Sequence, residues 1–259
     1  MNQNQNEFPT GPFYPAGISI FFRSVAGIGG GVIGSILISL VFFIFSTIGG
    51  VNFVTSAEGP AHPLFIFVLT IITLIGTISA NIMSAIFISY AEPQKYKKIA
   101  SVLTQVFIIN MSLFLFMTPI YVLGYVIDIN YLKIVVASHA IISVMASNLV
   151  LEIISDYRYS LLEIYSTITA TVFGILISII FYFLNQTTLI FVAMPTFWFC
   201  IGFFGGIVRM AYYTIYLNYG IDALSVNSGY SNYKDSEKFF AENSEKTEEE
   251  ELQEIFEEQ

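Results

Sequence analysis

Five long intervals without a charged residue dominate the chain between residues 24 and 208. Each is continuously apolar, and they cover residues 24–57, 59–91, 99–127, 134–151 and 164–208. A helix needs about 20 apolar residues to cross the hydrocarbon of a bilayer. The first four intervals each hold one crossing. The 45 residues of the fifth hold two, separated by a polar turn at 185–188. The pattern therefore predicts six crossings.

Lipid offers no hydrogen-bond partner to an open backbone, so continuous apolar runs indicate helices rather than the alternating strands of a barrel. The predicted helices lie near 29–49, 64–89, 101–127, 133–155, 161–184 and 188–216. The predicted fold is all-α: a polytopic integral membrane protein with a bundle of six transmembrane helices. It divides into an N-terminal cytoplasmic or interfacial segment (1–28), the transmembrane domain (29–217), and a cytoplasmic linker with an acidic, disordered tail (218–259).

The basic residues of the body predict the orientation of the bundle. Six of them fall on one predicted side of the membrane: Arg23, Lys95, Lys97, Lys98, Arg158 and Arg209. The opposite side has only Lys133. Because basic residues concentrate in cytoplasmic loops, both termini are expected in the cytoplasm, as an even number of crossings requires. We expect a multi-pass protein of the cell membrane.

Composition agrees with lipid as the main solvent and separates a tail from the body. Hydrophobic residues make up 55% of the chain and charged residues 11%, whereas an ordinary soluble domain is about 25% charged. The net charge of −9 belongs almost wholly to residues 232–259, which hold eleven acids and three lysines. This tail is a candidate contact for a cytoplasmic protein partner. Nucleic acid, itself a polyanion, is not an expected partner.

Three ionisable residues lie at one predicted depth near the cytoplasmic ends of the last three helices. They are Glu152, Glu163 and Arg209. Charges in a spanning segment are costly and often mark a solute pathway. The three residues form either a polar cluster that binds or gates a solute, or ion pairs that lock the helices together. The sequence favours the second interpretation.

Two further patterns concern helix packing and a polar face. His139, Ser143 and Ser147 recur every four residues and share one face of the fourth helix, as a candidate polar face. Glycine pairs four residues apart let helix backbones approach closely, and the pairs are Gly27 with Gly31, Gly30 with Gly34, and Gly202 with Gly206. They suit packing inside the bundle or, alternatively, between copies in a homo-oligomer.

The absence of several residue types and motifs from the sequence reduces the number of function classes to consider. It has two histidines and one cysteine, and it carries no metalloprotease, nucleophile-elbow or phosphate-loop motif. We therefore predict no catalytic residue, metal ligand or cofactor. The favoured function is a non-enzymatic membrane organising or partner-binding protein. The alternative is a small-solute transporter or channel that uses Glu152, Glu163 and Arg209, and an intramembrane enzyme ranks third.

Overall fold

The computed structural model describes residues 17–48, 63–92, 95–96, 99–127, 129–155, 159–184 and 186–219. Within these ranges the chain forms six helices: α1 (Gly17–Ile48), α2 (Pro63–Ala91), α3 (Ile99–Ile127), α4 (Ile129–Ser155), α5 (Ser160–Leu184) and α6 (Gln186–Tyr219). All six are long and apolar enough to cross a membrane. The prediction of six spanning helices is confirmed at this level. The acidic tail at 232–259 lies outside the described residues.

The first helix begins earlier than the charge pattern predicts. The expected start was residue 29, after an interfacial segment, but α1 starts at Gly17 and continues through Gly29–Gly31 without a break. The reason lies at Arg23, which the sequence analysis used as a marker of the aqueous side. Its side chain is only 2% exposed and pairs with Glu92 and Glu152. A paired guanidinium no longer forces the helix to begin beyond it.

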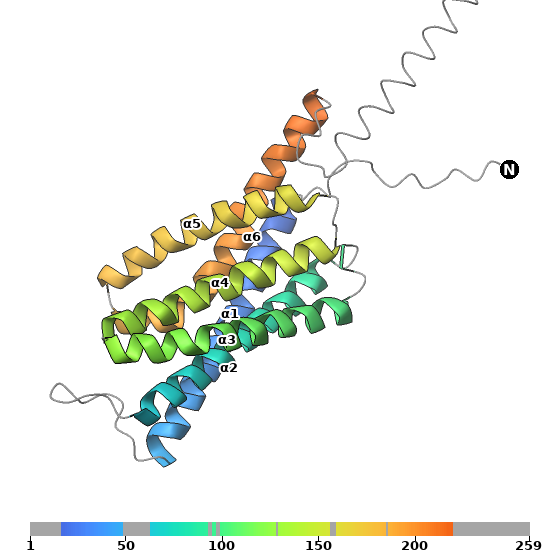
Figure 1. The fold of residues 1–259 in the computed structure, drawn as a ribbon. Helices are drawn as coiled ribbons and strands as arrows, with labels where there is room; N and C mark the ends of the chain where they lie inside the picture. The colour runs from blue at the N-terminus through green and yellow to red at the C-terminus, as the bar shows by residue number, and fades with distance from the viewer. Residues whose placement is uncertain are drawn as a thin grey trace, which may run out of the picture.

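The six helices close into one bundle. Each helix contacts the next along the chain, and α1 also packs along α6, so that the first and last helices meet. Figure 1 shows α1 and α2 running side by side. Further contacts join α2 to α4 and α4 to α6. The helices that carry polar residues are therefore neighbours in the interior as well as around the ring.

Glycines allow α1 to approach both of its neighbours closely. A Cβ atom added at Gly27 would lie 2.7 Å from the carbonyl oxygen of Trp198 in α6. One added at Gly34 would lie 2.9 Å from the carbonyl oxygen of Gly76 in α2. The same tight contacts occur at the other four predicted packing glycines: Gly30, Gly31, Gly202 and Gly206. These six glycines all face helix contacts within the bundle.

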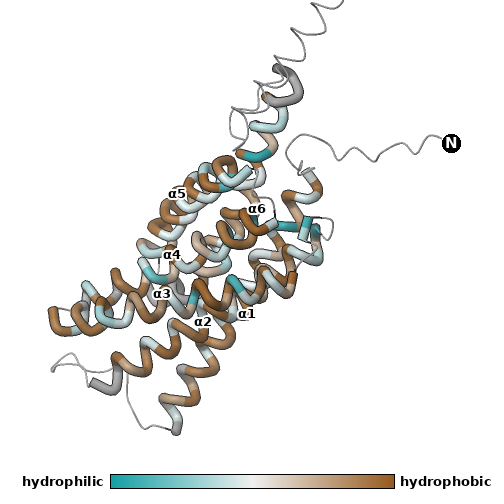
Figure 2. Tube along the Cα trace, turned by 45° about the vertical axis from the view of Figure 1, so that its right-hand side comes forward, coloured by the Kyte–Doolittle hydropathy of each residue, from teal (hydrophilic) through white to brown (hydrophobic). Residues whose placement is uncertain are grey.

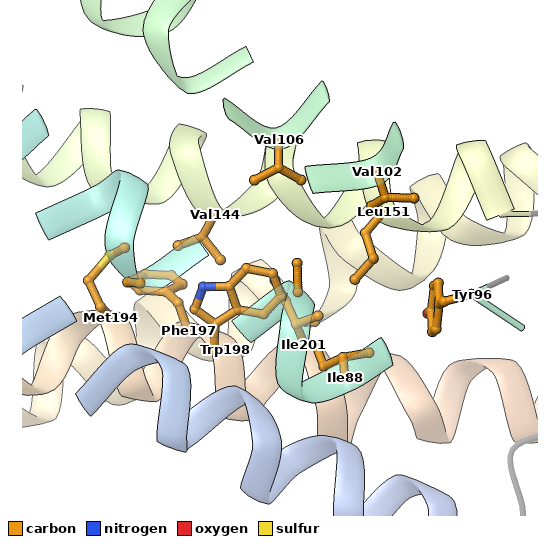
Figure 3. Packing of buried hydrophobic residues seen from close by; sticks show 13 residues of the cluster. Ile88, Tyr96, Val102, Val106, Val144, Leu151, Met194, Phe197, Trp198 and Ile201 are labelled. Carbon is orange, nitrogen blue, oxygen red and sulfur yellow. The ribbon is translucent and has the colours of Figure 1, made fainter. Parts of the chain in front are cut away.

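Apolar side chains fill the interior and also cover the outside. Figure 3 shows Trp198 of α6 beside Phe197, with Val144 of α4 and Ile201 close to its ring. Most residues along the six helices are hydrophobic, as the colouring of Figure 2 shows. Large apolar side chains point outward from every helix, including Phe21, Leu115 and Ile180. Such a surface suits lipid rather than water.

Candidate ionic site

The structure brings Glu152, Glu163 and Arg209 together at one end of the bundle. Arg209 of α6 meets Glu163 of α5 through two contacts to the same carboxylate oxygen: Nε donates to Oε2 at 2.8 Å, and Nη2 lies 2.7 Å from it. The Nη2 atom is also 3.4 Å from Oε1 of Glu152 in α4. The last three helices are thus joined at one place by charge-assisted contacts.

Two residues from the first hairpin enlarge this group. Nη1 of Arg23 in α1 donates to Oε2 of Glu92, which follows α2, at 3.1 Å. Ser19, one turn before Arg23, donates its hydroxyl to the other oxygen of Glu92 at 2.6 Å. Arg23 also pairs with Glu152. The first and second helices are therefore tied to the fourth by the same set of ions.

The connection between α2 and α3 supplies the last ion of this group, Lys95, and a tyrosine beside it. Nζ of Lys95 lies 2.5 Å from Oε2 of Glu152 and 3.5 Å from Oε1 of Glu163. The Tyr96 hydroxyl donates to Oε1 of Glu152 at 3.0 Å. We call Arg23, Glu92, Lys95, Glu152, Glu163 and Arg209 the ionic cluster. It contains three cations and three carboxylates, so its formal charge is zero.

Glu152 is the centre of the ionic cluster. Its carboxylate contacts all three cations, and its side chain is fully buried. From the sequence, Glu152 is expected near the end of the fourth helix, Arg23 in an N-terminal cytoplasmic or interfacial segment, and Lys95 in the loop between the second and third helices. One feature of the sequence pointed to further members of the ionic cluster, because Glu92 and Lys95 lie within four residues of the end of α2. Without the tertiary packing, nothing directed those short flanks back toward α4 and α5.

The ionic cluster lies near one end of the bundle, but exposed apolar side chains extend past it. On four helices, exposed apolar residues continue past the charged residue toward the end of the bundle. They are Ile18 and Phe21 before Arg23, Ile154 after Glu152, Leu161 before Glu163, and Ile215 after Arg209. The charges are thus enclosed in a region whose outer surface is suited to lipid. Electrostatic interactions are strong in such low-dielectric surroundings.

Burial and neighbouring charges act in opposite directions on the groups of the loop. Burial lowers the pKa of Lys95 to about 8, although Glu163 opposes the shift. Burial alone would raise the pKa of Glu92, but the charges of Arg23 and Lys95 outweigh it and hold that pKa below its usual value. Burial raises the pKa of the Tyr96 hydroxyl, which stays protonated as a donor. At neutral pH Glu92 is therefore ionised and Lys95 is mainly protonated.

A second polar group lies deeper in the bundle and joins four helices. The amide nitrogen of Asn81 in α2 donates to Oδ1 of Asn110 in α3 at 2.9 Å and to Ser143 in α4 at 2.6 Å. Trp198 of α6 donates to Oδ1 of Asn81 at 3.0 Å. Asn110 in turn donates to Ser147 at 2.8 Å. Each amide serves as donor and acceptor, which is how polar residues hold membrane helices together.

The predicted polar face of α4 has two kinds of partner. Ser143 and Ser147 join the asparagine network, whereas Nδ1 of His139 lies 2.9 Å from the hydroxyl of Tyr121 in α3. All three residues are fully buried. Nε2 of His139 has no hydrogen-bond partner among the described residues. Asn148, on another face, donates to Thr167 of α5 at 2.7 Å.

Within the described ranges, no three histidine, cysteine, aspartate or glutamate residues gather closely enough to hold a metal ion. The chemistry that the ionic cluster offers is the pairing and separation of charges. Comparison with protein-family models, curated proteins and solved structures finds no match to this chain.

Proposed function

We propose that the protein is a membrane transporter for a small solute and that the ionic cluster is its gate. The observation that carries this proposal is the enclosure of six ionisable side chains, from five segments of the chain, behind an apolar outer surface. Ionisable residues at such a depth usually mark a solute or ion pathway. The predicted orientation places the gate on the cytoplasmic side.

The energetics of buried ions support a gate over a purely structural lock. Removing several charges from water costs free energy that mutual attraction offsets only partly. Replacing a buried ion pair by apolar residues of similar volume is often neutral or stabilising. A lipid-embedded bundle that needed only cohesion could use glycine and amide contacts, as it already does around Gly27 and Asn81. A transport cycle in which the charges of the ionic cluster separate would explain why they are present in the bundle.

Opening of the gate is testable with one engineered cysteine. Cys200 is the single cysteine of the chain, so Cys200→Ser gives a cysteine-free background. In that background Ser166→Cys places a thiol one turn beyond Glu163, at a fully buried position. A transporter that opens should allow a membrane-impermeant maleimide to label this thiol within minutes. The matched control is Ala80→Cys, buried between α1 and α2, which should stay unlabelled.

Flux through the reconstituted protein completes the test. Proteoliposomes are loaded with pH-sensitive and potential-sensitive dyes and exposed to a panel of small ions and neutral solutes. Wild-type protein should move at least one of them, and Glu152→Gln should reduce that flux at least tenfold. An unlabelled Ser166→Cys together with unaltered flux in Glu152→Gln would exclude the ionic cluster as a gate.

The second candidate is the partner-binding role that the sequence favours. The fully paired amides of Asn81 and Asn110 favour it, because they tie α2 to α3, α4 and α6 in one fixed register. A rigid bundle suits a protein that presents its acidic tail to a cytoplasmic partner. Deleting residues 232–259 should then remove the proteins that co-purify with the full chain. An unchanged set would argue against this role.

A further inference from the structure

Lys95 occupies the space between two carboxylates that belong to different helices. Its ammonium group lies 2.5 Å from Glu152 of α4 and 3.5 Å from Glu163 of α5. Lys95 differs from the other two cations in its attachment. Arg23 and Arg209 lie within α1 and α6, whereas Lys95 lies in the short connection between α2 and α3. Its side chain is 7% exposed, the highest value among the three cations.

The charge balance of the ionic cluster depends on this one loop residue. With Lys95 in place, three cations face three carboxylates. If the Lys95 side chain withdraws, two guanidiniums remain against three carboxylates, and the site has a formal charge of −1. An uncompensated charge in a low-dielectric interior is strongly unfavourable. A single monovalent cation between Glu152 and Glu163 would restore neutrality, whereas a divalent ion would leave an excess of positive charge.

We infer that Glu152 and Glu163 form a binding site for one monovalent cation or a small primary ammonium ion, and that Lys95 is its tethered internal occupant. The inference rests on the proposed transport function and names the chemical class of the solute or of a coupling ion. The Tyr96 hydroxyl, 3.0 Å from Glu152, provides a further oxygen beside the site. Withdrawal of the Lys95 side chain would exchange its ammonium group for an ion from solution.

The surroundings of Lys95 make the exchange dependent on pH. The ionisable groups that face it come from α1, α4, α5, α6 and the loop itself: Arg23, Glu92, Tyr96, Glu152, Glu163 and Arg209. Burial lowers the pKa of Lys95 to about 8. Above that pH the ammonium becomes neutral while both guanidiniums stay charged. The site then has the same formal charge of −1 as it has after withdrawal of the Lys95 side chain.

Thermal unfolding in detergent tests the site without any transport assay. The buried Trp198 is the single tryptophan and reports on unfolding by its fluorescence. Lys95→Met should unfold at a lower temperature in choline chloride. Sodium, potassium or methylammonium chloride at equal ionic strength should raise that temperature by roughly 3 °C or more. Wild-type protein at pH 7 should show no difference between these salts.

Two control variants separate a specific site from general charge effects. Lys95→Met/Glu163→Gln restores a formal charge of zero and should lose the response to small cations. Arg23→Met also leaves a charge of −1, but Lys95 still fills the space between Glu152 and Glu163. The unfolding temperature of Arg23→Met should therefore depend only weakly on the choice of cation. Equal responses in Arg23→Met and Lys95→Met would overturn the inference.

The wild-type chain provides a test that does not depend on a variant that folds. At pH 9.5 Lys95 has lost most of its positive charge, so the two carboxylates no longer hold it between them. Its side chain can then leave the space to small cations, which should raise the unfolding temperature of the wild-type protein relative to choline. An identical temperature in all salts at pH 9.5 would contradict the cation site. Salt-dependent stability without flux in proteoliposomes would retain the site and reject transport. Flux without any salt-dependent stability would retain transport and reject the cation site.

Discussion

Glu152 is the residue on which the ionic cluster depends most, because every cation of the cluster contacts it. Its neighbours Arg209 and Glu163 form the best-aligned pair, with Nε and Nη2 both within 2.8 Å of one carboxylate oxygen. Both side chains are almost completely buried. Loss of one partner therefore leaves a charge that water cannot reach. The free energy of unfolding should therefore fall strongly when one partner is substituted and only slightly when both are substituted.

We predict strong coupling between Glu163 and Arg209. Glu163→Gln and Arg209→Met should each lower the free energy of unfolding by about 3–5 kcal/mol, because each leaves an unpaired buried charge. The double variant keeps the ionic cluster neutral and should recover most of that loss. A double-mutant cycle measured by denaturation in mixed micelles gives the coupling. Additive effects of the two substitutions would mean that the pair does not interact as the geometry indicates.

The pH dependence of stability should reflect Glu92. Its pKa is lower in the folded protein than in the unfolded chain, so the folded state binds fewer protons between those two values. Its stabilising contribution is complete above the unfolded pKa, near 4.5, and is lost as the pH falls through the folded pKa. Glu92→Gln should be less stable than wild type at pH 7, and the difference should shrink on acidification. Unfolding temperatures between pH 7 and pH 3 measure this effect.

Two different kinds of contact hold the helices in register. Around α1, glycines bring backbone against backbone on the sides that face α2 and α6. In the interior, Asn81 and Asn110 connect α2 and α3 to α4 and α6 through side-chain hydrogen bonds. The glycine contacts depend on the absence of a side chain, and the asparagine contacts depend on polar groups. Substitutions should therefore affect the two regions for different physical reasons.

The contact between α1 and α6 should not tolerate a larger side chain. Gly27→Leu would place atoms where the backbone of Trp198 already lies, so the helices would have to separate. Overpacking of this kind typically costs about 1–3 kcal/mol. Gly17→Leu is the matched control, because none of the described residues lies within 4 Å of an added Cβ there. Unfolding temperatures should fall for the first variant alone, and equal temperatures would show that the contact is loose.

At the scale of the whole molecule, the bundle is polar at one end and in a narrow interior region, and apolar over most of its outer surface. All six helices are long enough to cross a bilayer. The ionic cluster unites the N-terminal part of α1 with the C-terminal parts of α4 and α6. An even number of crossings places the ends of α1 and α6 near this cluster on the same side. The excess of basic residues predicts that this side is the cytoplasmic one.

Orientation can be measured with the same cysteine-free background. Single cysteines at Thr10 and Ser236 should both react with an impermeant maleimide only in inside-out vesicles. A cysteine at Ser56, in the connection between α1 and α2, should react only in right-side-out vesicles. Labelling of Thr10→Cys and Ser236→Cys from opposite sides would contradict the six-helix topology.

The number and type of the helices could be predicted from the sequence, because lipid imposes a simple rule on long apolar runs. The start of α1 could not, because Arg23 marks a boundary in a one-dimensional charge pattern but is buried in the structure. The grouping of Glu152, Glu163 and Arg209 at one depth followed from helix direction and length alone. The functional meaning of that group stays a prediction.

Sequence by itself determined that this chain forms six helices long and apolar enough to cross a membrane, because hydropathy over about 20 residues decides between lipid and water. Only the tertiary structure decided which charges meet. Arg23, Glu92 and Lys95 are distant from Glu152 in sequence, and their pairing depends on how α1 packs on α2 and α6 and on the path of the α2–α3 connection. Pairing of charges is a property of distance in space, which hydropathy along the chain does not contain.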